Sequence, residues 1–137
     1  EWCHMGATVD SFKATHQVAV SLLAQIDSAG GQQRVDALNS LKEALLAHVR
    51  EENNVIQEAM DKAGVEGPFK SSAQRFMGEL GSIAQTALLP FFDKYSSSDA
   101  VGSDDFANDF NGIKSALADR IAFEEGMFYP ELEKLGY

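Results

Sequence analysis

The chain has 137 residues, enough for one domain with a hydrophobic core of its own. Apolar residues make up 45% of it and charged residues 23%, which suits a soluble globular protein and excludes a disordered chain. The 11 Lys and Arg residues against 21 Asp and Glu residues give a net charge of −10 with no basic cluster. This balance argues against nucleic acid and against an anionic membrane surface as partners.

The single cysteine, Cys3, provides neither a disulfide framework nor a cysteine-based zinc site. A reducing cytoplasm is therefore the expected compartment. No stretch approaches the roughly 20 apolar residues of a membrane span. The residues before Met5 fit poorly with the rest of the sequence, so we interpret residues 1–5 as an expression scar and residues 6–137 as a single domain.

Apolar residues recur at steps of three and four along most of the chain, which predicts amphipathic helices. The first helix is expected from about Val9 to Ala29, where Gly30 and Gly31 end it. The second is expected over about residues 32–63, up to Gly64. Together they make the first helical pair.

The third helix is expected to start at Pro68, a residue suited to a first helical position, and to run to about Tyr95 with a kink or an early end at Pro90. Residues 96–103 form the longest polar loop, and a fourth helix continues from there until Pro130 closes its regular part. Strand signals are missing from the sequence. The prediction is an all-α protein, an antiparallel up-down-up-down four-helix bundle.

Four ionisable residues interrupt the apolar stripes, each near the middle of its helix: His16, His48, Glu52 and Glu124. His48 and Glu52 stand one turn apart on the same helix face. Imidazole and carboxylate groups that point inward need partners, and together they suit iron, manganese or zinc. We favour a metal site, and the other interpretation is a core in which these side chains bond to one another.

The second and fourth helices repeat one pattern at an offset of 124 − 52 = 72 residues. The offset aligns Glu52 with Glu124 and His48 with Arg120. A guanidinium cannot bind a cation and stays protonated. If Arg120 points inward, it must pair with Glu124 or Glu79 and would oppose a highly charged metal cluster.

Two further carboxylates lie near these positions. Glu79 adjoins the core position Leu80 between two glycines, and it is either a fifth ligand, a surface carboxylate or a partner of Arg120. Glu125 comes directly after an inward Glu, so we expect it at the rim of the bundle, as an ion-pair partner or a support for the ligands.

An aromatic group gathers towards the ends of the third and fourth helices. We expect these residues to form an apolar plug at one end of the bundle: Phe91, Phe92, Tyr95, Phe128 and Tyr129. A cofactor or gas pocket is the alternative for this end.

With these residues in place, the sequence resembles a bacterial hemerythrin-like (HHE-type) domain over about residues 7–135. The resemblance implies an antiparallel four-helix bundle with a non-haem diiron centre that binds O2, senses oxygen or redox state, or handles iron and NO. It does not imply an enzyme. Four segments carry it: Phe12–His16, His48–Glu52, Phe76–Gly81 and Arg120–Pro130, the last being similar to the family's His-Ile-x-x-Glu-Glu-x-x-Leu-Phe-Pro ending.

By this resemblance four residues match ligand positions of the family, namely His16, His48, Glu52 and Glu124. Two positions depart from it, because the third-helix His is replaced by Leu80 and the fourth-helix His by Arg120. The full diiron set is therefore incomplete. The expected cofactor is mono- or dinuclear iron, or none.

Two other functions remain open from the sequence. In the first, the chain is a metal-free four-helix module that has an ion-paired core around Arg120 and acts by binding another protein. In the second, it is a histidine phosphotransfer bundle, which is less favoured because both His16 and His48 lie on the core stripe and no Lys-Gly pair comes after either.

Overall fold

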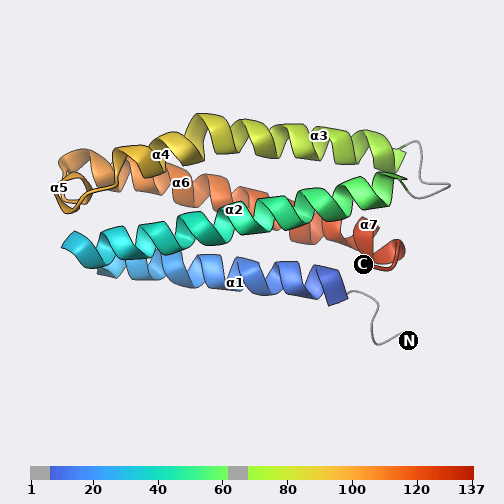
Figure 1. Cartoon of the computed structure of the whole chain (residues 1–137), viewed down its shortest axis with the longest axis horizontal. Coiled ribbons are helices and arrows are strands. Elements are labelled where there is room, and N and C mark those ends of the chain that lie inside the picture. Colours follow the sequence, from blue (N-terminus) through green and yellow to red (C-terminus); the bar gives the residue numbers. More distant parts are fainter. Residues whose placement is uncertain (1–6, 62–67) are drawn as a thin grey trace.

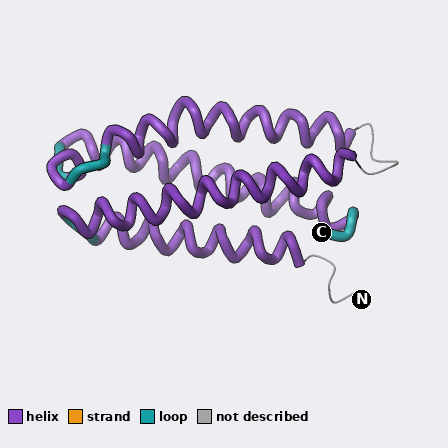
Figure 2. Tube along the Cα trace, viewed as in Figure 1, coloured by secondary structure: helices purple, strands orange, loops and turns teal. Residues whose placement is uncertain are grey.

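The computed structural model of the chain describes residues 7–61 and 68–137. Within these two ranges all the regular structure is helical, so the predicted all-α class is confirmed. Figures 1 and 2 show the long helical stretches lying side by side along the longest axis as a helical bundle. The expected scar at residues 1–5 and the expected end of the second helix at Gly64 lie outside the described residues.

The first two stretches are α1 (Ala7–Ser28) and α2 (Gly31–Asp61), which pack along each other (Figure 1). Gly31 turns the chain between them with a φ of 56°, a left-handed conformation that favours glycine. Arg34 holds this turn, because its Nε donates to the Ile26 carbonyl at 3.0 Å and its Nη1 to the Val101 carbonyl at 3.1 Å.

The third stretch starts at Pro68, as predicted, and joins α3 (Pro68–Ile83), the π-helical turn η2 (Ala84–Leu88) and α4 (Leu89–Lys94). Pro90 has no N–H, and its ring would collide with the carbonyl four residues earlier in a regular α-helix. The wider π turn just before Pro90 relieves that conflict. The helix therefore continues past Pro90 instead of ending there.

The segment that was predicted as a polar loop contains a short helix, α5 (Ser98–Val101), so that prediction was wrong in part. The side chain of Ser97 caps it by accepting a hydrogen bond from the Ala100 N–H at 3.2 Å. Val101 is buried in the core and anchors the helix. Two adjacent apolar residues, Ala100 and Val101, in a polar sequence were too weak a signal to reveal it.

The fourth stretch consists of α6 (Asp104–Phe123), the π-helical turn η3 (Glu124–Phe128) and α7 (Tyr129–Lys134). Pro130 again lies two residues after a π turn, and the helix again continues beyond it. The prediction that Pro130 closes the regular helix was wrong for the same reason as at Pro90. Both proline-containing stretches thus remain helical beyond the proline after one widened turn.

The buried apolar residues form two clusters. The α5-end core includes Ile26, Leu38, Leu41, Phe91, Phe92, Tyr95, Phe106, Phe110 and Leu117. The α7-end core includes Val9, Phe12, Ile56, Ala73, Phe76, Leu80, Phe128, Tyr129 and Leu132. The expected single aromatic plug was therefore wrong, because its members are divided between the two cores.

The two ends of the described chain meet at the α7-end core. The Val9 N–H donates to the Tyr137 carbonyl at 3.0 Å, and the Tyr137 hydroxyl donates to Glu58 at 2.6 Å. Among the helices of residues 7–61 and 68–137, none has the length and apolar character that crossing a bilayer requires.

Candidate metal centre

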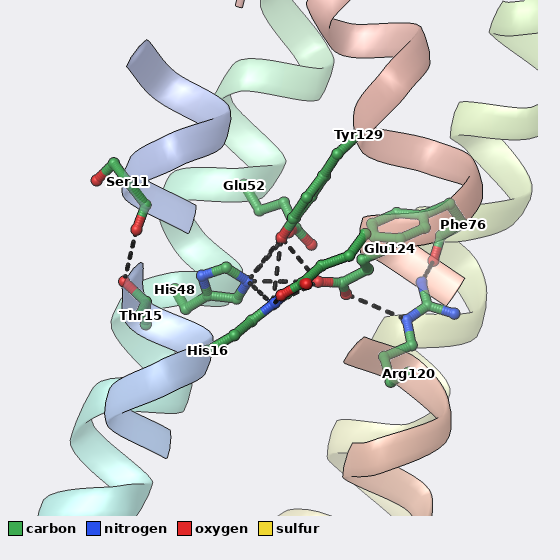
Figure 3. A network of polar contacts seen from close by, with 10 residues as sticks. Ser11, Thr15, His16, His48, Glu52, Phe76, Arg120, Glu124 and Tyr129 are labelled. Atoms are coloured by element: carbon green, nitrogen blue, oxygen red, sulfur yellow. Dashed lines mark hydrogen bonds and ion pairs between the residues drawn. The ribbon is translucent and has the colours of Figure 1, made fainter. Parts of the chain in front are cut away.

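Four buried ionisable side chains lie between the two cores, where the apolar stripes of three helices are interrupted. His16 comes from α1, His48 and Glu52 come from α2, and Glu124 begins η3 (Figure 3). One ligand atom from each of the four lies within 4.8 Å of the others. The structure thus brings together the four residues that the sequence singled out.

The closest contacts join the Nε2 atoms of the imidazoles to carboxylate oxygens. His16 Nε2 lies 2.8 Å from Glu124 Oε1, and His48 Nε2 lies 3.0 Å from Glu52 Oε2. The two Nε2 atoms are 3.2 Å apart. Both histidines therefore aim the same nitrogen at one point, and each faces a carboxylate there.

Tyr129 is the member of the site that sequence reasoning missed. Its hydroxyl lies 2.6 Å from Glu52 Oε2 and 2.8 Å from Glu124 Oε1, so its single proton can be donated to either carboxylate (Figure 3). The same oxygen is 3.2 Å from His16 Nε2. The phenol thus stands at the centre of the group, although its ring packs in the α7-end core.

The π turn explains this position. In a regular α-helix, residues five apart point about 140° away from each other. In η3 the Tyr129 N–H bonds to the Glu124 carbonyl, an i to i+5 bond that stacks the two residues on one face. Pro130, inside an apolar-periodic stretch, was the sequence signal that could have indicated this turn.

Glu125 contacts the outer side of His16. Its Oε2 lies 2.7 Å from His16 Nδ1, and its side chain is 32% exposed, in keeping with the expected place at the rim. A carboxylate on one ring nitrogen fixes the orientation of an imidazole and favours binding through the other nitrogen. For His48, in contrast, the buried Nδ1 has no hydrogen-bond partner among the described residues.

Arg120 lies one turn before Glu124 and points inward, with a side chain that is only 11% exposed. Its Nε is 3.4 Å from Glu124 Oε2, and its Nη2 donates to the Phe76 carbonyl at 2.9 Å. The guanidinium also covers the Phe76 ring, 4.0 Å from the centroid. Glu124 therefore faces the histidines with one oxygen and a fixed positive charge with the other.

Glu79, for which the sequence left a ligand, a surface carboxylate and a partner of Arg120 open, stays outside the group of four. Its side chain is 49% exposed, and its carboxylate pairs with Arg120 Nη1 at 3.8 Å and with Arg75 at 3.6 Å. The neighbouring Leu80 takes the inward position on α3. The structure thus places Glu79 as a partner of Arg120.

The two carboxylates of the site differ in their electrostatics. Burial would raise the pKa of Glu124, but hydrogen bonds with His16, His48 and Tyr129 outweigh it and lower that pKa to about 2. Burial raises the pKa of Glu52, and its contacts with His48 and Tyr129 only partly oppose this. Glu124 is therefore the permanently charged member of the pair.

The histidines respond to these carboxylates. Burial would lower the pKa of His48, but hydrogen bonds with Glu124 and Glu52 raise it to about 9. The pKa of His16 is also raised, since its bonds to Glu124 and Glu125 exceed the opposing effect of burial. Burial and the two nearby carboxylates raise the pKa of Tyr129. The electrostatics of the site thus favour protons on the imidazoles and on the phenol.

A small enclosed cavity of about 40 Å³ adjoins the group of four. Its surface is apolar, although the histidines and Glu124 border it. Leu80 lines it at the position where the family resemblance expects a histidine. The residues around it are Thr15, His16, Ala19, Leu45, His48, Val49, Leu80, Leu88, Leu117, Arg120, Ile121 and Glu124.

The donor set fits one metal ion. Two imidazole nitrogens and two carboxylate oxygens lie within 4.8 Å of one another, close enough to bind the same ion. This mixture of ligands suits iron, manganese or zinc. In addition, Glu52 Oε1 is buried without a hydrogen-bond partner among the described residues, so the site has an unused donor.

A family model described as hemerythrin HHE cation binding domain matches residues 7–132. The chain belongs to this family. The resemblance predicted from the sequence is thereby confirmed, and the buried His and Glu group of this hemerythrin HHE domain is the place where a cation can bind. No curated protein and no solved structure matches the chain.

Proposed function

We propose that this hemerythrin HHE domain binds non-haem iron through His16, His48, Glu52 and Glu124 and serves in oxygen or redox sensing or in iron handling. One observation carries the proposal: four buried ligand atoms, two of them from imidazoles, converge within 4.8 Å of one another. Burying such groups is costly unless they are paired or hold a metal. Bound iron would supply a redox-active, gas-accessible centre.

The chain's own residues prepare this site. Glu125 holds the ring of His16, so that its Nε2 faces inward. Tyr129 supplies a proton that can lie between Glu52 and Glu124. The two cores above and below exclude water.

The proposed small-molecule partner is O2 or NO. The cavity of about 40 Å³ beside His16 and His48 supports this choice. It is large enough for a diatomic molecule, and its apolar surface offers no hydrogen bonds that would hold water there instead. We propose binding and sensing instead of catalysis, with neither nucleic acid nor membrane as a partner, given the net charge of −10.

The proposal includes the antiparallel up-down-up-down order of four helices, which brings residues near the middle of each helix to one level. It also includes a cytoplasmic location. The support for that location is the sequence, in which one cysteine leaves no disulfide framework.

The test is metal analysis of protein produced with added iron and purified without chelators. We expect iron to be retained and to give a charge-transfer absorption. Iron at about 100 times its Kd should also raise the free energy of unfolding by about 2.7 kcal/mol. His48→Ala should abolish both effects, while Arg50→Ala, an exposed change on the same helix, should leave them intact. Iron-free protein whose stability does not respond to iron would contradict the proposal.

A second candidate function is a metal-free interaction or signalling module with an ion-paired core. The inward position of Arg120 favours it, because the guanidinium already balances part of the charge on Glu124 and Glu79. This function predicts that chelator treatment changes neither the stability of the protein nor its binding to a partner protein. Loss of stability after chelation would exclude it.

A further inference from the structure

We propose that the site holds one metal ion per chain, because the guanidinium of Arg120 occupies the place that a second ion would need. This inference rests on the proposed function and narrows it, since the family resemblance implies a dinuclear centre. The contacts of Glu124 and Arg120 carry it.

The two oxygens of Glu124 face different partners. Oε1 faces the imidazoles, at 2.8 Å from His16 Nε2 and 3.5 Å from His48 Nε2. Oε2 faces the Nε of Arg120 at 3.4 Å (Figure 3). A carboxylate that bridges two ions gives one oxygen to each. In this chain one oxygen is directed to the group of four and the other to a side chain that is itself a cation.

The guanidinium is held where it is. Its Nη2 donates to the Phe76 carbonyl at 2.9 Å, and its carbon lies 4.0 Å from the centre of the Phe76 ring. It also packs near the Phe123 ring, at 5.2 Å. These contacts come from α3 and from the end of α6, so the group cannot leave without breaking the packing between two helices.

The donors on this side are already engaged. Glu124 Oε2, Glu79 Oε1 and the Phe76 carbonyl all contact Arg120. Leu80, which is buried next to the cavity, carries no ligand atom. A second ion would have to displace a positive charge from all three oxygens and then lie beside it.

Charge supports the same count. A single divalent ion and Arg120 together supply three positive charges, against the two buried carboxylates Glu52 and Glu124 and the half-exposed Glu79. A second divalent ion would add two positive charges next to a guanidinium that stays protonated. At low effective dielectric, like charges a few ångströms apart repel each other strongly.

The experiment counts ions per folded chain. The protein is titrated with Fe(II) without oxygen by calorimetry, and the bound iron is measured by elemental analysis after desalting. We expect one ion for the wild type and for Arg120→Lys, which keeps the charge. We expect two for Arg120→His, which removes the fixed charge, frees Glu124 Oε2 and adds an imidazole. Arg75→His, an exposed change that also removes a partner of Glu79, should stay at one and serves as the matched control.

Two ions per wild-type chain would overturn the inference and leave the proposed function standing. No bound iron would overturn both. A folded Arg120→His protein that binds a single ion would show that the guanidinium does not set the count, which also overturns the inference. If Arg120→His does not fold, the wild-type count and Mn(II) electron paramagnetic resonance decide, because coupled ion pairs give a spectrum distinct from that of isolated ions.

Discussion

The second and fourth helical stretches build the two halves of the site from the same spacing, but with opposite chemistry. On α2 the residue one turn before the carboxylate is His48, which joins Glu52 at 3.0 Å. On α6 that residue is Arg120, which joins Glu124 at 3.4 Å. One half therefore offers two donors to a cation, while the other offers one donor and a cation of its own.

This difference shows that a pattern repeated in two helices can keep the positions of the buried carboxylates while the residue one turn earlier changes its chemistry. Both carboxylates are buried at the same level of the bundle. The α2 half leaves Glu52 Oε1 and His48 Nδ1 buried without hydrogen-bond partners among the residues described. In the other half Arg120 Nε also makes no hydrogen bond among those residues, but it lies 3.4 Å from the opposite charge of Glu124 Oε2. The fourth-stretch half is instead held by a guanidinium, the Phe76 ring and a phenol. The first half is thus prepared for a ligand, and the second half is already charge-paired.

The largest expected effect separates Glu52 from Glu79, the two carboxylates predicted as ligands on α2 and α3. Glu52→Leu should weaken iron binding by at least about 100-fold, because loss of a ligand costs more than loss of a supporting contact. Glu79→Leu should change it by less than about tenfold, since Glu79 is half-exposed and pairs with arginines. Calorimetric titration with iron measures both. Equal losses in the two variants would contradict the separation.

The next effect concerns the charge in the fourth-stretch half. Arg120→Leu should lower the free energy of unfolding of the chelator-stripped protein by about 3 kcal/mol, because it leaves Glu124 Oε2 buried without its cation. Arg75→Leu, on an arginine that is 80% exposed, should cost less than about 0.5 kcal/mol. Urea unfolding measures both. If the two variants lose the same stability, Arg120 is not part of a buried ion pair.

The stability of the metal-free protein should depend on pH in two directions. The lowered pKa of Glu124, about 2, gives stability that is present above its unfolded value of 4.5 and lost as the pH falls towards 2. The raised pKa of His48, about 9, gives stability that is present below 6.5 and lost as the pH rises through 9.

The stripped protein should therefore be most stable between pH 4.5 and 6.5. The loss on either side should approach about 3 kcal/mol, counted once because both shifts reflect the same ion pairs. The raised pKa of Glu52 reduces this gain, since it disfavours the charged carboxylate. Urea unfolding from pH 3 to 9 measures the curve. A flat profile would mean that the ion pairs between the halves are not formed.

The smallest effect tests the contact that joins the halves. Tyr129→Phe removes the hydroxyl that reaches both Glu52 and Glu124, and it should destabilise the stripped protein by about 1–2 kcal/mol. Tyr95→Phe is the comparison in the α5-end core, where the hydroxyl contacts the exposed Lys94–Asp109 pair. Its cost should be smaller, because water can replace that contact. A larger loss for Tyr95→Phe would reverse the expected order.

The sequence predicted that four polar side chains are buried together, because their positions obey α-helical periodicity. His16, His48, Glu52 and Glu124 all stand where an apolar residue was due, and a polar group there must be buried with partners. A ligand role was considered for Glu79 because it lies one residue from the apolar stripe, but Leu80 occupies the inward position there. A difference of one residue on a helix turns a side chain by about 100°, which suffices to take it from core to solvent.

The features that the sequence could not predict depend on departures from that period. Tyr129 was assigned to an apolar plug because α-helical spacing turns it away from Glu124, whereas η3 stacks the two. The short helix α5 escaped notice because propensity in a polar stretch of eight residues is weak. Both errors came from applying a regular period where local hydrogen bonding overrides it.

The π turn at Glu124–Phe128 contains one residue more than a regular α-helical turn. Removing Gly126, which is exposed and contacts nothing at its Cβ position, would restore the regular count and rotate the rest of the helix by about 100°. Glu124 would keep its place, but Tyr129 would swing out of the site and Pro130 would collide with the turn before it. The one extra residue of the π turn therefore both brings the Tyr129 hydroxyl into the site and accommodates Pro130 in the helix.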